Sequence, residues 1–77
     1  MPTILNQNGF RFFFYSNEHE PMHIHVEKGD FAAKFNLIPV NLVENQGMKN
    51  KDLGQIEDII KENQAHFIAK WKAYFNK

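Results

Sequence analysis

The spacing of the apolar residues changes once along this chain, and that change limits the folds the chain can adopt. In the first half, apolar and polar residues largely alternate, as they do in strands with one covered face. From about Asn50 the apolar residues recur at steps of three and four, the period of an amphipathic helix. Strands followed by helix form the α+β pattern. We therefore expect a small antiparallel sheet of four to five strands over residues ~3–44, packed on one long or broken C-terminal helix over residues ~50–75.

Turn residues divide the first half into strands. Asn8-Gly9 is a dipeptide that tolerates positive φ at both centres of a type I′ turn, and it predicts a hairpin. Lys28-Gly29-Asp30 predicts a second tight turn, and Pro39 marks the start of an edge segment because proline cannot donate to a central ladder. The strands are expected at Thr3–Gln7, Phe10–Ser16, Met22–Glu27, Phe31–Leu37 and Val40–Glu44.

The helical segment is too long to lie straight across a domain of this size. About 26 residues at a rise of about 1.5 Å per residue would span about 39 Å, whereas a chain of this length folds into a narrower body. A kink or break is therefore predicted near Asn63-Gln64.

Size and composition exclude several classes of protein. A chain of 77 residues builds one core, so we expect a single α+β domain over residues 1–77. The absence of cysteine excludes disulfides, thiolate metal ligands and cysteine nucleophiles. The nine basic and nine acidic residues cancel, which argues against a surface that generally attracts nucleic acid or membranes. With no leader pattern and no long apolar run, we expect a cytoplasmic protein without a membrane partner.

A helix covers only one face of a small sheet, so the opposite face holds the candidates for function. Strand alternation assigns the apolar sets, including Phe31, to the helix side. A slip of one residue in the central strand would invert its contribution. We call the other side the open face; its expected members are Arg11, Phe13, Tyr15, His23, His25, Glu27, Lys34 and Asn36.

Acid–base chemistry is one hypothesis for this face. His23 and His25 are the candidate catalytic residues, since an imidazole near its ordinary pKa of about 6.5 exchanges protons at neutral pH. Cations beside them would hold a phosphate and aromatic rings would stack a base, as in a metal-independent ribonuclease. The candidate binding residues are Arg11, Phe13, Tyr15, Glu27 and Lys34.

Two other hypotheses remain open on the residues alone. Imidazoles at alternate strand positions point the same way about 6.5 to 7 Å apart, so His23 and His25, with His19 from the preceding loop, would bind a divalent metal. Alternatively, the face is a non-catalytic module whose exposed aromatic residues dock a partner protein.

The residues also resemble a known family over essentially the whole chain. The segments that carry the similarity are Pro2–Ile4, Gly9–Asn17, Glu20–Val26, Ala33–Phe35, Pro39-Val40, Asn63 and Trp71–Phe75. They resemble a small bacterial domain-of-unknown-function family, number 4160 in its series, and the resemblance implies a shared fold.

The chain departs from the family pattern at two positions. Met22 replaces a proline before the histidine pair, and Lys49 replaces a serine helix cap, for which we expect Asn50 to substitute.

The resemblance implies no established activity. Family members often resemble one half of a two-gene toxin–antitoxin-like cassette, which implies a cognate small protein from a neighbouring gene as partner. We therefore expect a component of such a module that binds RNA or that protein through the open face. No cofactor is expected outside the metal hypothesis, and a homo-oligomer is compatible with so small a core.

Overall fold

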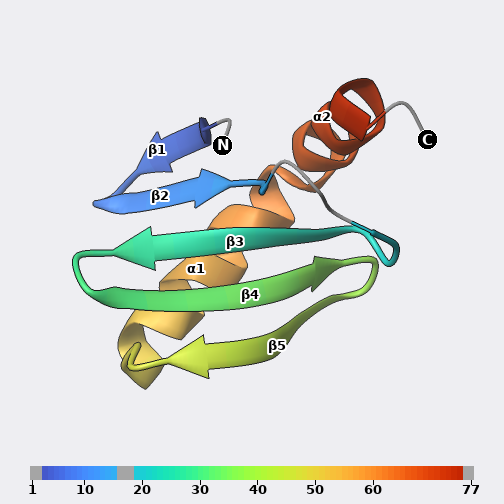
Figure 1. The fold of residues 1–77 in the computed structure, drawn as a ribbon. Helices are drawn as coiled ribbons and strands as arrows, with labels where there is room; N and C mark the ends of the chain where they lie inside the picture. The colour runs from blue at the N-terminus through green and yellow to red at the C-terminus, as the bar shows by residue number, and fades with distance from the viewer. Residues whose placement is uncertain (1–2, 16–18, 76–77) are drawn as a thin grey trace.

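The computed structural model describes residues 3–15 and 19–75, and it has five strands followed by two helices (Figure 1). The strands are β1 Thr3–Gln7, β2 Phe10–Phe13, β3 His23–Lys28, β4 Phe31–Leu37 and β5 Val40–Gln46. The helices are α1 Asn50–Glu62 and α2 Gln64–Phe75. This arrangement confirms the predicted α+β class.

The sheet is an antiparallel meander in the order β1-β2-β3-β4-β5. Asn8 and Gly9 both have positive φ, 55° and 84°, as the predicted hairpin requires. β2 is shorter than predicted, because its ladder ends at Phe13, and Ser16 lies outside the described residues. The edge strand β5 is longer than predicted and continues to Gln46.

Both helices pack on one side of the sheet, and the predicted break between them is confirmed at Asn63. α1 crosses behind the strands in Figure 1, and α2 continues past the end of β2. The Asn63 backbone N–H donates to the carbonyls of Ile59 and Ile60, and its side chain donates to Ile59 O at 2.8 Å. Gln64 then donates from Nε2 to Leu37 O at 2.6 Å, which ties the start of α2 to the end of β4.

The start of α1 differs from the prediction. Lys49, and not Asn50, is the N-cap residue, and its side chain makes no capping hydrogen bond. Asn45 instead braces the preceding turn, since its amide accepts from the Met48 N–H at 2.9 Å and donates to the Met48 carbonyl at 3.0 Å.

On the outer face of α1, a hydrogen bond from Lys61 to Glu57, together with the charge of that carboxylate, raises the pKa of Lys61.

Aromatic side chains form much of the core between sheet and helices. Phe12 stacks on Phe67 with ring centroids 5.5 Å apart, and Trp71 meets Phe14 edge-to-face at 5.4 Å. The fully buried large side chains are Trp71, Phe10, Phe12, Phe14, Phe35, Phe67, Ile24, Leu37, Ile56, Ile60 and Val26.

No helix among the described residues is long and apolar enough to cross a membrane.

One residue assigned to the helix side is more exposed than that assignment suggested. Phe31 is 46% exposed, although alternation places it with the buried residues of β4. It begins the strand beside the Gly29 turn, and its ring lies over Gly47: a Cβ added there would be 2.6 Å from Phe31 Cδ1. The ring therefore packs on glycine backbone at the edge of the core.

We predict opposite effects for two alanine substitutions. Gly47→Ala should lower the free energy of unfolding by about 1–2 kcal/mol, since its φ of +92° strains an alanine and the Phe31 ring must move. Gly54→Ala should raise it by about 0.5–1 kcal/mol, since this helical glycine has open space around it. Urea unfolding of both variants measures the difference. Equal effects of the two substitutions would contradict the prediction.

Candidate functional site

The strand register brings the open-face residues into line across three strands. Arg11 of β2 stands opposite Glu27 of β3, and Phe13 stands opposite His25. His25 in turn stands opposite Lys34 of β4. Because the helices lie on the other side, these side chains belong to the face turned towards the viewer in Figure 1.

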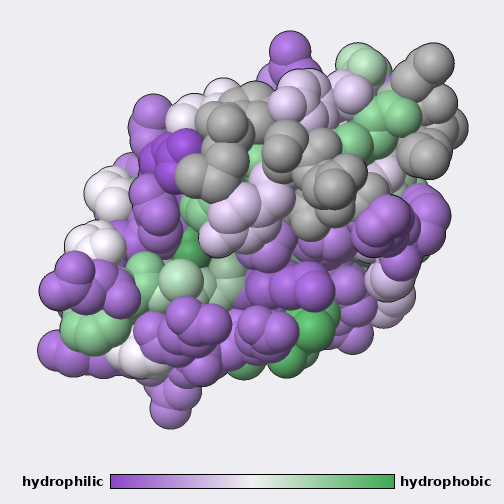
Figure 2. All heavy atoms as spheres, in the orientation of Figure 1, coloured by the Kyte–Doolittle hydropathy of each residue, from purple (hydrophilic) through white to green (hydrophobic). Residues whose placement is uncertain are grey.

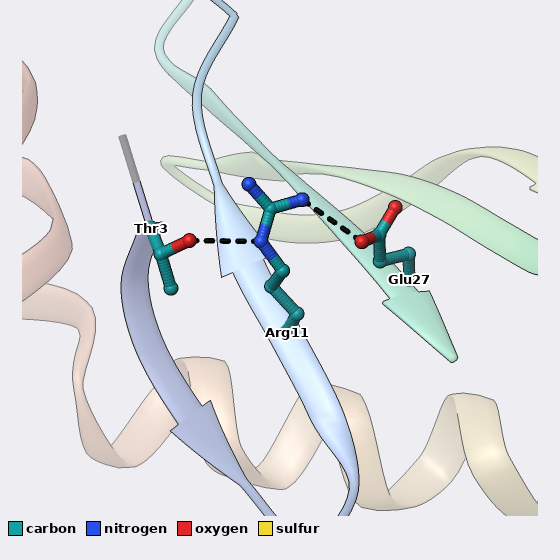
Figure 3. A network of polar contacts seen from close by, with 3 residues as sticks. All are labelled: Thr3, Arg11 and Glu27. Carbon is teal, nitrogen blue, oxygen red and sulfur yellow. Dashed lines mark hydrogen bonds and ion pairs between the residues drawn. The ribbon is translucent and has the colours of Figure 1, made fainter. Parts of the chain in front are cut away.

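Arg11 is held by three neighbours, of which Figure 3 shows Thr3 and Glu27. Its Nε donates to Thr3 Oγ1 and its Nη1 donates to Glu27 Oε1, both at 2.8 Å. The guanidinium carbon also lies 4.4 Å from the centroid of the Phe13 ring. The side chains of Arg11 and Glu27 are 27% and 43% exposed, so this ion pair adds less than about 1 kcal/mol to stability. The pair nevertheless engages Arg11 and Glu27, two of the three charged residues that were predicted to bind a ligand.

Aromatic and imidazole rings form a continuous row beside this pair. Tyr15 meets the His25 ring edge-on at 4.4 Å between centroids, and Phe13 stacks against His25 at 5.6 Å. His25 and His23 are 5.1 Å apart, and His23 lies 5.1 Å from Trp71. The row therefore runs from the exposed Tyr15 on the open face to the buried indole of α2.

His23 is buried, contrary to the prediction that it lies open beside His25. Only 6% of it is exposed, and its Nδ1 donates to the Pro21 carbonyl at 2.8 Å. The β2–β3 ladder stops at the Phe13–His25 pair, two residues short of His23. Trp71 packs against the ring there, so the helix covers a position that alternation alone leaves on the open side.

Two hollows flank Lys34 on the open face. The first, about 150 Å³, is lined by Phe13, Tyr15, His25, Lys34, Glu44 and Gln46, among others. The second, about 370 Å³, includes His19, Glu20, His23, Lys34, Asn36 and Val43. Figure 2 views the same side and shows hydrophilic side chains over much of it, with hydrophobic ones over β4 and β5.

The three histidines of the metal hypothesis do not form a common site. Within residues 3–15 and 19–75, no three His, Cys, Asp or Glu side chains are grouped closely enough to hold a metal ion. His19 is exposed at the second hollow, and Nδ1 of His23 is engaged with Pro21 O. The geometry gives this hypothesis no support.

Sequence reasoning missed the contribution of β5 to the site. Glu44 stands opposite Lys34, while the next pair is Phe35 with Leu42, so Val43 is an extra residue in the ladder. Such a bulge interrupts the alternation from which faces are read. The only available signal was the acid itself, placed in an otherwise uncharged strand.

Comparison with known proteins identifies the family without a function. A family model described as a domain of unknown function, DUF4160, matches residues 9–72. The chain belongs to this family. Its structure is that of a small α+β domain with one sheet face that neither helix covers. No match was found among curated proteins or among solved structures.

We predict that His23 matters for stability. His23→Ala should lower the free energy of unfolding by roughly 1–3 kcal/mol, because it removes a buried hydrogen bond and the ring that packs on Trp71. His19→Ala, the matched exposed histidine, should change it by less than about 0.5 kcal/mol. Urea unfolding followed by tryptophan fluorescence measures both, and equal stability of the two variants would show that the contacts of His23 contribute nothing.

Proposed function

We propose that this protein is a non-catalytic binding module that docks a second small protein on its open face. The resemblance to members of toxin–antitoxin-like gene pairs suggests that the partner is encoded by the neighbouring gene. The observation that carries the proposal is a charge-balanced sheet face that neither helix covers, with the exposed ring of Tyr15 at a hollow in it.

The charges of this face favour a protein partner over nucleic acid. Arg11 is paired with Glu27, and Lys34 stands opposite Glu44, so two cations face two acids. A surface that binds a phosphate backbone needs an excess of cations to release counterions. The whole chain has no such excess either, with a formal net charge of zero.

Exposed apolar side chains at the rim supply contact area. Tyr15 is 45% exposed at the first hollow, and Val43 of the edge strand, which is equally exposed, lines the second. Tyrosine is enriched at protein interfaces because a rigid ring provides contact area and its hydroxyl a hydrogen bond. Tyr15 and Val43 therefore give a partner one exposed apolar side chain at each of the two hollows, as the anchor and rim of an interface do.

Capture of the neighbouring gene's product tests this function. Tyr15→Ala should weaken binding by roughly tenfold or more, as loss of an interface tyrosine does. The control is Tyr74→Ala, since Tyr74 is equally exposed but lies at a different hollow, between β1 and α2. Calorimetry on the co-purified pair gives both affinities, and equal weakening by the two substitutions would place the interface elsewhere.

Metal-independent RNA cleavage is a second candidate, supported by one observation. His25 and His23 are 5.1 Å apart, and His25 stands opposite Lys34 at the first hollow. Such a pair provides an acid and a base beside a phosphate-binding cation. The burial of His23 and the neutralised Arg11 weigh against this function, which is why we rank it second.

RNA cleavage has its own test. If the second candidate holds, purified protein shortens cellular RNA in the presence of a chelator, and His25→Ala removes that activity while His66→Ala on the surface of α2 retains it. We expect intact RNA with all three proteins. Cleavage that depends on His25 would replace the binding-module proposal with the ribonuclease.

A further inference from the structure

Lys34 differs from the other cations of the described strands in lacking an acidic partner. Arg11 is paired with Glu27 at 2.8 Å, and Lys28 lies 3.5 Å from Asp52. In the described part of the chain no carboxylate lies within ion-pairing distance of Lys34. The side chain is nevertheless half-buried in the middle of β4. An ammonium that is partly withdrawn from water is stabilised when an anion approaches it.

A second donor lies two residues along the same strand. Asn36 is also half-buried, and its side-chain amide makes no hydrogen bond to the described residues. Residues at alternate strand positions point the same way, and both Lys34 and Asn36 line the larger hollow. Two donors directed into one hollow match the two oxygens of a carboxylate.

Two acids near Lys34 limit the negative charge that a ligand of this site can carry. Glu44 stands opposite Lys34 on β5, and Glu20 lies at the rim of the larger hollow. One carboxylate can approach the ammonium more closely than either acid, but a chain of phosphates would be repelled by both. The other titratable groups that line the two hollows are Tyr15, His19, His23 and His25.

We propose that Lys34 and Asn36 form a receiving site for a carboxylate of the partner protein. This inference rests on the proposed function and names the chemistry of the partner: an acidic side chain or chain terminus that enters the hollow beside Lys34. Tyr15, at the other hollow along Lys34, then contacts the adjoining part of the same partner.

The test titrates the full chain with two short peptides while backbone amide resonances are followed by NMR. The probes are acetyl-Ala-Glu-Ala-amide and its neutral match, acetyl-Ala-Gln-Ala-amide. The glutamate peptide should shift the resonances of Lys34 and Asn36 saturably, and the glutamine peptide should not. Lys34→Gln should weaken binding of the glutamate peptide by roughly tenfold, which is about the contribution of one charge-assisted hydrogen bond.

Two further variants separate recognition from a structural effect. Glu44→Gln should strengthen binding of the glutamate peptide, because it removes a negative charge opposite Lys34. Lys70→Gln, on exposed α2 surface, should leave the affinity unchanged. Circular dichroism spectra that match the wild type show that each variant is folded.

Equal shifts with both peptides, or an unchanged affinity in Lys34→Gln, would overturn the inference. Tighter binding of an oligouridylate to the same residues would overturn it as well, since the site would then select phosphate. The titration needs no partner protein. If the titration fails, the carboxylate site is ruled out but the Tyr15-dependent capture of a partner can still succeed. If the capture fails, the proposed docking function is ruled out whatever the titration shows.

Discussion

The pairing of β2, β3 and β4 determines which side chains the helices cover and which lie on the open face. In one layer, Phe12 stands opposite Val26 and Val26 opposite Ala33, and all three are buried in the core. In the other layer, Phe13, His25 and Lys34 stand opposite one another on the open face. A slip of one residue would exchange the layers, exposing the core rings and burying the charges. The packing of α1 isoleucines and α2 aromatic rings on the first layer therefore holds the open face in register.

The same pairing explains why the face is nearly neutral. Arg11 has an acid directly across the ladder, and the two form an ion pair within the sheet. Lys34 also has an acid across the ladder, but no ion pair forms. The contrast leaves one half-buried ammonium beside two hollows. It makes the face suitable for a single acidic group within a larger neutral contact.

Local signals in the sequence predicted most of the fold. Asn8-Gly9 specifies its hairpin through the positive φ of both residues, and the helix breaks at Asn63 as its length required. Alternation also placed Arg11, Phe13, Glu27 and Lys34 on one face. Alternation did not predict the exposure of Phe31 beside a turn or the burial of His23 beyond the end of a ladder. It also gave no face for Glu44, which follows a bulge.

The amino-acid sequence by itself determined the class of fold, the order of its elements and the residue types available for chemistry, because turns and periodicity act over a few neighbours. The tertiary structure decided the state of each side chain. Trp71, far along the chain, buries His23, and Thr3 and Glu27 from two different strands hold Arg11. Burial and charge pairing depend on what packs from elsewhere in the chain. That is why three histidines in a short segment became one buried ring, one ring beside the hollow and one exposed ring.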